Sequence, residues 1–154
     1  MIRTWRITDA RYGAQAFDGE GARLFGGRWN HKGTSVVYTC DSLALAALEQ
    51  LVHVSAGHVL PPRVAISVDI SDAVSRRELT AAELPQDWRN PAGSQDLKAL
   101  GTLWAAQLES AVLIVPSVVI PQQRNYVLNP LHPDFALLEI GEVEPFAFDP
   151  RLLS

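Results

Sequence analysis

The chain has 154 residues, 47% of them hydrophobic and 19% charged, which is typical of one globular domain that buries its own core. Its formal net charge of −4 lacks the basic excess that binding to a phosphate backbone normally requires, so direct nucleic-acid binding is disfavoured. We therefore expect a single domain over residues 1–154.

The first quarter of the chain is predicted to hold two strands separated by a long loop. Residues 1–8 alternate well enough for a strand, and residues 34–40 are β-branched and aromatic, which is typical of a buried strand. Residues 9–32 are rich in glycine, charge and aromatic side chains without a clear period, which indicates a loop. A loop of that length inside a small domain is often functional.

A helix is predicted over residues 43–56, with Asp41 or Ser42 as its N-cap. Its apolar residues fall on one broad arc, and Glu49 and His53 lie at the edge of this arc. Glu49 is thus expected to border the core. The arc consists of Leu43, Leu45, Leu48, Leu51, Val52 and Val54.

The middle of the chain alternates between regular and irregular segments. Residues 63–70 alternate as a strand does, and residues 95–110 repeat apolar side chains at helical spacing. Between them, residues 71–94 mix charges with proline and glycine, which favours a surface loop with short helical pieces.

The last third is predicted to be mostly strand and turn. Residues 111–115 and 118–120 are apolar on either side of Pro116, which indicates strand around this proline. Residues 125–133 are turn-rich, and residues 135–146 supply a last strand or pair of strands.

The glycine and histidine patterns predict neither a nucleotide motif nor a metal site. Gly19, Gly21 and Gly26 begin like a dinucleotide fingerprint, but Leu24 stands where that pattern needs glycine. A P-loop would need lysine directly after Gly26. The four histidines are scattered and the single cysteine offers no thiolate pair, so we expect no bound metal.

The lone cysteine, Cys40, lies on an apolar strand, where a free cysteine usually packs as a small hydrophobe; a nucleophilic role is the less favoured alternative. It allows no internal disulfide. The N-terminus has no signal-peptide pattern, and no apolar run approaches the roughly 20 residues of a membrane span. We therefore expect a cytoplasmic protein without membrane association.

Several short motifs, in their order and spacing, resemble the RES family of toxins from RES–Xre toxin–antitoxin systems. The family is named for an arginine, a glutamate and a serine, which by motif position fall on Arg28, Glu49 and Ser117. The resemblance covers nearly the entire chain. The motifs are Gly26-Gly27-Arg28-Trp29-Asn30 with Gly33, Val37-Tyr38-Thr39, Ala46-Ala47-Leu48-Glu49, Val115-Pro116-Ser117 and Asn125-Tyr126 with Leu128-Asn129-Pro130.

This resemblance implies a fold, an activity and partners. RES proteins are similar in fold to ADP-ribosyltransferase toxins, which implies one α+β domain with mixed β-sheets flanked by helices around an NAD+ cleft. The implied activity is cleavage of the bond between nicotinamide and ribose, with NAD+ as substrate and no cofactor. The family also implies a cognate Xre-type antitoxin and a homodimer.

The residue types at the matched positions suit this chemistry. Arg28 offers a planar fork for the diphosphate, and Gly27 lets the backbone come close to it. Tyr38 would stack on the pyridinium ring and orient it. Glu49 would stabilise the positive charge that develops on the ribose. In addition, Ser117 and Asn125 would hold nicotinamide or ribose.

Ordinary roles stay open for these residues: a surface arginine stacked on Trp29, a solvated helix glutamate, and turn hydrogen bonds. For the whole protein, NAD+ consumption with water or phosphate as acceptor is the favoured hypothesis. Transfer of ADP-ribose to a macromolecule and a binding module without activity are the alternatives. The chemistry requires that Arg28 and Glu49 face one shared pocket.

Overall fold

The computed structural model describes residues 1–54 and 60–153. The described helices are α1 (Glu20–Phe25), α2 (Leu43–Leu51) and α3 (Gln95–Ala106), with 3-10 turns at Ala10–Gln15, Ala81–Glu83, Pro133–Leu137 and Pro150–Leu153. The strands are β1 (Ile2–Asp9), β2 (Val37–Cys40), β3 (Arg63–Ile70), β4 (Arg76–Glu78), β5 (Val112–Pro116), β6 (Arg124–Leu128), β7 (Glu139–Ile140) and β8 (Glu144–Phe146).

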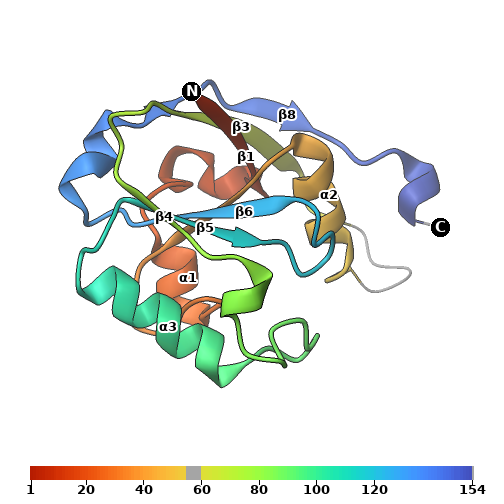
Figure 1. Cartoon of the computed structure of the whole chain (residues 1–154). Helices are drawn as coiled ribbons and strands as arrows, with labels where there is room; N and C mark the ends of the chain where they lie inside the picture. The colour runs from red at the N-terminus through yellow and green to blue at the C-terminus, as the bar shows by residue number, and fades with distance from the viewer. Residues whose placement is uncertain (55–59, 154) are drawn as a thin grey trace.

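Within the described residues, these strands form one eight-stranded sheet in the order β4-β5-β6-β2-β1-β3-β7, and β8 also pairs with β3. The sheet is mixed, because β4 and β5 are parallel whereas their neighbours pair antiparallel. β1 pairs along its whole length with β3, but it meets β2 only at Trp5 and Cys40. This short junction lets the sheet curl, and Figure 1 shows β1 and β3 crossing β5 and β6 at an angle.

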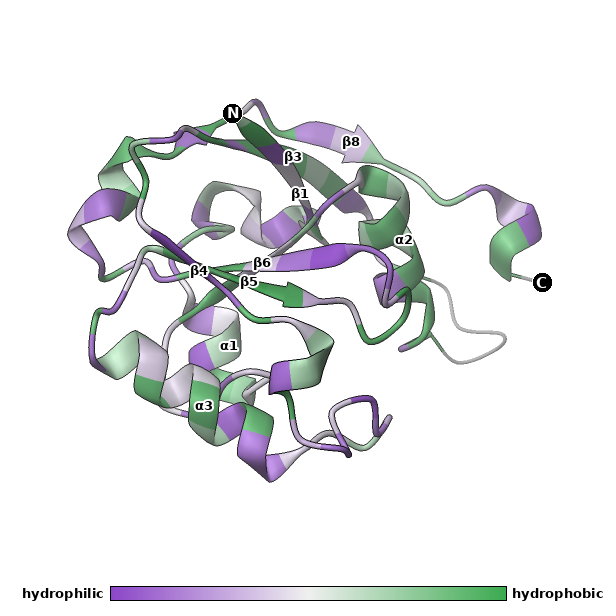
Figure 2. Cartoon of the chain, viewed as in Figure 1, coloured by the Kyte–Doolittle hydropathy of each residue, from purple (hydrophilic) through white to green (hydrophobic). Residues whose placement is uncertain are grey.

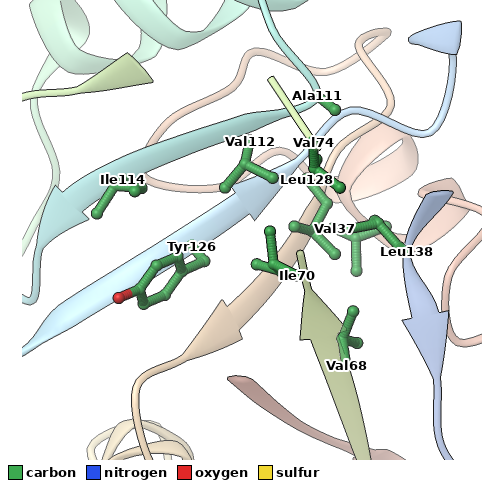
Figure 3. Close-up of a cluster of buried hydrophobic side chains, with 10 residues drawn as sticks. All are labelled: Val37, Val68, Ile70, Val74, Ala111, Val112, Ile114, Tyr126, Leu128 and Leu138. Atoms are coloured by element: carbon green, nitrogen blue, oxygen red, sulfur yellow. The ribbon is translucent and has the colours of Figure 1, made fainter. Parts of the chain in front are cut away.

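Side-chain alternation along β5 divides the core into two layers. Val112 and Ile114 face a cluster that includes Ile70 and Leu128, which Figure 3 shows gathered on one side of the sheet. Leu113 and Val115 face the opposite cluster, which contains Leu97 and Trp104 of α3. Helix α3 therefore covers this second face (Figure 1).

Helix α2 begins at the N-cap Ser42, whose hydroxyl accepts a hydrogen bond from the Leu45 amide at 3.0 Å. Its buried residues, Leu45 and Ala46, pack with Ile7 of β1 and Cys40 of β2. Figure 1 shows α2 beside the connection between β5 and β6. The predicted helix is thus confirmed but shorter, because it ends at Leu51; residues 55 and 56 lie outside the described part.

Several other predictions from the sequence are confirmed. β1 and β3 occupy the predicted segments, and α3 begins at the predicted Gln95. β7 and β8, which both pair with β3, are the two strands in the segment that was predicted to hold a last strand or pair of strands. β2 covers only the second half of the predicted strand. No helix among residues 1–54 and 60–153 has the length and apolarity that crossing a bilayer would need.

The prediction of a continuous loop over residues 9–32 is wrong, because this segment contains a 3-10 turn and α1. The short helix is stabilised locally. The carboxylate of Asp18 accepts from the Glu20 amide at 2.8 Å, Glu20 pairs with Arg23 one turn later, and Gly26 ends the helix at a φ of 72°. These capping residues are visible in the sequence, but the segment was not predicted as a helix because its apolar residues have no helical spacing.

Two strands were missed and one was wrongly expected. β4 lies within the predicted surface loop 71–94, and β6 occupies the start of the predicted turn region 125–133. Residues 118–120 form a bend instead of a strand. β6 was missed because Asn125 and the Asn-Pro pair after it are turn-forming residues, although the strand is paired on both sides by β2 and β5.

Candidate functional site

The carboxylate of the half-buried Glu49 lies at the centre of a polar cluster where α2 meets β2, β5 and β6. Its Oε1 accepts a hydrogen bond from Ser117 Oγ at 2.8 Å and one from Asn125 Nδ2 at 3.1 Å. Its Oε2 accepts from Asn125 Nδ2 at 3.1 Å and from Cys40 Sγ at 3.2 Å. Donors from three strands or strand ends therefore hold both oxygens and fix the carboxylate in one orientation.

The sequence placed Glu49 at the edge of the apolar arc of its helix, where it borders the core, and the half-buried position of Glu49 agrees with this prediction. The buried positions are Leu45 and Ala46, four and three residues before Glu49, so the glutamate lies on their side of the helix. The arc itself was wrong at Leu48 and Val52, which it predicted to be covered but which are 40% and 60% exposed.

The hydroxyl of Ser117 forms three hydrogen bonds within the protein. It accepts hydrogen bonds from the amides of Val119 and Ile120, both at 3.1 Å, and donates to Glu49. A hydroxyl has one donor hydrogen and two acceptor lone pairs, so all its bonding capacity is used. Ser117 thus fixes the turn after β5 and the carboxylate together, while direct contact with a ligand stays a prediction.

Asn125 contributes to the same cluster from β6. Its amide nitrogen contacts both oxygens of Glu49 and also Cys40 Sγ, the last at 3.3 Å. Figure 2 shows hydrophilic colour on part of β6 beside the hydrophobic β5; the polar residues of β6 are Arg124 and Asn125. The predicted ligand contact of Asn125 is untested, but its position beside Glu49 is clear.

Arg28 lies in a tight turn, in which Gly27 and Asn30 form a bridge. Its Nη1 donates to the carbonyl of Asn90 at 2.8 Å. Burial lowers the pKa of Arg28, and the nearby negative charge of Glu49 opposes this effect. The charge of Glu49 therefore acts on Arg28, whereas the shared pocket that the NAD+ hypothesis requires stays a prediction.

Helix α3 holds the turn that carries Arg28. Lys98 Nζ donates to the Gly27 carbonyl, and the Thr102 hydroxyl accepts from the His31 amide at 2.9 Å. Between them, Gly101 lets the Trp29 carbonyl approach so closely that a Cβ added to the glycine would lie 1.8 Å from that oxygen. Gly101 and Thr102 lie three and four residues after Lys98, so one face of α3 supports the turn.

Tyr38 of β2 connects the turn to the sheet. Its hydroxyl donates to Asn30 Oδ1 at 2.6 Å and accepts from the Trp29 amide at 3.0 Å. Burial raises the pKa of this hydroxyl, which stays protonated. Because the hydroxyl is occupied, the ring is the part of Tyr38 that a ligand can meet. Gly27 is constrained by the same contact, since a Cβ there would lie 2.6 Å from the hydroxyl.

The structure adds Arg6, which the sequence interpretation missed. Arg6 lies on β1 and donates from Nη1 to the Tyr38 carbonyl at 3.2 Å, while its Nε is enclosed without a hydrogen-bond partner. It lines a cavity of about 610 Å³ together with Tyr38, Asp18 and Gly26. Burial lowers the pKa of Arg6, and the charge of Asp18 opposes this effect. The sequence offered one signal for Arg6, an arginine within a segment that otherwise has the pattern of an ordinary strand.

The predicted residues thus come together in two adjoining groups. Ser117 and Asn125 surround Glu49, whereas Gly27 and Tyr38 belong to the turn that carries Arg28. Tyr38 also lines the cavity beside Arg6. An anionic ligand in this cavity would meet a guanidinium, and a cationic centre near α2 would meet the carboxylate.

The model of the RES domain matches residues 3–149 of the chain. The chain belongs to the RES family. A "Prs ADP-ribosylating toxin" from Sphingobium sp. strain YBL2 is 39% identical over 97% of this chain and 95% of that protein. A "Toxin Res" from Yersinia enterocolitica is 37% identical over 96% of this chain and 97% of that protein. The identification of a RES-family chain from its short motifs is therefore confirmed.

The fold of this RES protein also occurs in a solved structure, that of the M. tuberculosis MbcT–MbcA toxin–antitoxin complex. The match has a TM-score of 0.76 at 21% sequence identity and covers 95% of this chain and 84% of the matched chain. At this identity the likeness establishes the fold alone. It confirms the expected single α+β domain. The expected mixed β-sheets are one curled, mixed sheet among the described residues, and the NAD+ cleft stays a prediction.

Proposed function

We propose that this RES protein is the toxin of a toxin–antitoxin pair and that it cleaves the bond between nicotinamide and ribose in NAD+. The observation that carries the proposal is the Glu49 carboxylate, fixed by Ser117, Asn125 and Cys40 next to the guanidinium of Arg28. The RES relatives named as toxins support the biological role.

The cluster suits a reaction in which positive charge moves from the nicotinamide to the sugar. When the glycosidic bond breaks, its electron pair leaves with neutral nicotinamide, and the ribose becomes an oxocarbenium-like cation. A carboxylate held in place beforehand stabilises that cation more than it stabilises the ground state. Water then attacks C1′ and loses a proton to solvent or to Glu49, which gives ADP-ribose.

Two guanidinium groups are available for the diphosphate of the substrate. Arg6 presents an enclosed Nε that has no partner in the structure, and Arg28 has donors left after its bonds to backbone carbonyls. Arg6 contacts the carbonyl of Tyr38, and Arg28 precedes Trp29, whose amide donates to the Tyr38 hydroxyl. We propose that the diphosphate binds between the two guanidinium groups and that the Tyr38 ring orients the nicotinamide.

Arg6→Gln and Arg28→Gln are each expected to raise the KM for NAD+ about 10-fold or more, because each removes a charged donor to phosphate. The measurement is the initial rate of nicotinamide release against NAD+ concentration. Arg63→Gln is the matched control, since Arg63 also has an enclosed Nε without a partner but lines a different cavity, beside Phe146 and Phe148. An unchanged KM in both arginine variants would contradict the proposed clamp.

A second candidate, ADP-ribose transfer to a macromolecule, is favoured by one observation: a relative that is 39% identical is named as ADP-ribosylating. In this case a nucleophilic side chain of the target replaces water at C1′. Incubation of the purified chain with labelled NAD+, alone and with cell extract, separates the candidates. Free ADP-ribose indicates hydrolysis, phosphorylated ADP-ribose indicates phosphate as acceptor, label on a protein indicates transfer, and no nicotinamide release contradicts both enzymatic functions.

We also propose an Xre-type antitoxin as partner and a homodimer as the assembly of the toxin. The solved toxin–antitoxin complex, whose matched chain has the same fold, supports the first part. Co-expression with the product of a neighbouring gene is expected to restore growth that the chain alone inhibits. Light scattering on the purified chain tests the dimer, and a monomer at all concentrations would contradict it.

A further inference from the structure

We propose that Cys40 is a positioning residue that holds the Glu49 carboxylate through its thiol hydrogen. This inference rests on the proposed role of Glu49 in NAD+ cleavage. From the sequence, we favoured packing of Cys40 as a small hydrophobe on an apolar strand, with a nucleophilic role as the alternative. The structure keeps it buried, 7% exposed, but places its sulfur against the central carboxylate of the site.

The backbone of Cys40 is fixed from both sides. Cys40 is the last residue of β2, where it pairs with Trp5 of β1 and with Asn125 of β6. It therefore stands at the junction of the two parts of the sheet. Its Sγ lies 3.2 Å from Glu49 Oε2 and 3.3 Å from Asn125 Nδ2. Such a position gives the sulfur little freedom to move away from the carboxylate.

The direction of these bonds follows from the groups involved. Asn125 Nδ2 can only donate, so the sulfur accepts from it, and the carboxylate oxygen Oε2 accepts, so the thiol donates to it. Burial, reinforced by the charge of Glu49, raises the pKa of the thiol. The hydrogen is therefore present at neutral pH, and the sulfur is not a thiolate.

The thiol restrains the oxygen that Ser117 does not reach. Oε1 receives the Ser117 hydroxyl and the Asn125 amide, whereas Oε2 receives the same amide and Cys40. Without Cys40, Oε2 would keep only the shared amide among the described residues. The terminal torsion of glutamate is intrinsically broad, so the carboxylate would then turn more freely. Cys40 thus narrows the orientation in which Glu49 faces the sugar.

Substitutions at Cys40 distinguish its hydrogen bond from its packing. Cys40→Ser keeps a donor, whereas Cys40→Val fills the site with an apolar group. We expect Cys40→Ser to keep kcat within about threefold of the wild type and Cys40→Val to lose about 10-fold in kcat at unchanged KM. Ile7→Val, in the same apolar cluster, is the control for packing and should keep the wild-type kcat.

The comparison of kcat with KM adds a readout that a general loss of packing would not give. Loss of the thiol hydrogen bond loosens only the carboxylate, so we expect kcat to fall while the KM for NAD+ stays the same, and Cys40→Ser should keep kcat. The proposal is overturned if Cys40→Val keeps the wild-type kcat, or if Cys40→Ser loses activity that Cys40→Val retains.

Carbon NMR of the Glu49 carboxyl at neutral pH separates this inference from the proposed function. Because the thiol donates to this carboxylate, the chemical shift of the carboxyl carbon is expected to differ between Cys40→Val and the wild type, whether or not NAD+ is cleaved. If the wild type releases no nicotinamide but this difference is present, the proposed function fails and the thiol–carboxylate bond stands. Equal chemical shifts in the two proteins overturn the inference itself.

Discussion

Glu49→Gln is expected to lower the turnover of NAD+ about 100-fold or more while the KM for NAD+ changes little. Glutamine keeps the shape of the side chain, and its carbonyl oxygen still accepts from Ser117 and Asn125. What it loses is the negative charge, whose attraction to the ribose grows only as the glycosidic bond breaks. The effect therefore falls on kcat, which is measured as nicotinamide release at saturating NAD+.

The exposed Glu142→Gln, in the loop between β7 and β8, is the matched control, because it removes the same charge from the surface. It should turn over NAD+ at the wild-type rate. Thermal unfolding of both variants shows whether they remain folded. If folded Glu49→Gln keeps near-normal turnover, Glu49 is not the group that stabilises the cationic sugar.

Gly101→Ala is expected to destabilise the protein by about 3 kcal/mol or more, which is the upper range for forcing extra volume into a packed contact. The added Cβ would lie 1.8 Å from the Trp29 carbonyl, so α3 or the turn that carries Arg28 must shift. In most helix interiors the same change stabilises by roughly 0.5–1 kcal/mol, so the sign of the effect is itself diagnostic. Chemical denaturation of the purified variant measures it.

Gly21→Ala is the matched control for this substitution. Gly21 also lies in a helix, α1, but a Cβ there would meet nothing within 4 Å. The free energy of unfolding of Gly21→Ala should equal that of the wild type or be slightly higher. Gly101→Ala should in addition raise the KM for NAD+, because the shift displaces Arg28. Equal stability of the two variants would contradict the close packing of α3 against the turn.

The sequence predicted correctly those segments whose apolar residues follow a single pattern, either strand alternation or helical spacing. The alternation of β1 and β3 and the helical spacing of α3 predicted these elements where they lie. β6 was missed because Asn125, and the Asn129-Pro130 pair directly after the strand, are residues that commonly form turns. Pairing partners far away in the chain decided its structure, and no local pattern contains that information.

The site shows a different reason for failure. An amphipathic arc assumes that charged residues face solvent, so it placed Glu49 at the edge and Leu48 and Val52 inside. The structure half-buries the glutamate among donors and exposes the two apolar residues. Disagreement between local pattern and tertiary position is expected at functional sites, where partial burial of charge is offset by specific partners. Arg6 was missed because a half-buried cation on a regular strand does not disturb the strand pattern.

The bonds of Ser117 also bear on how this protein can be inhibited. Its oxygen is saturated by two amides and a carboxylate, and the neighbouring thiol of Cys40 stays protonated, so neither is an activated nucleophile. Electrophilic reagents that label reactive serines or thiolates should therefore leave the site unmodified. Reversible compounds that imitate a flattened, positively charged sugar match its electrostatics, and they are the chemical class from which inhibitors should be sought.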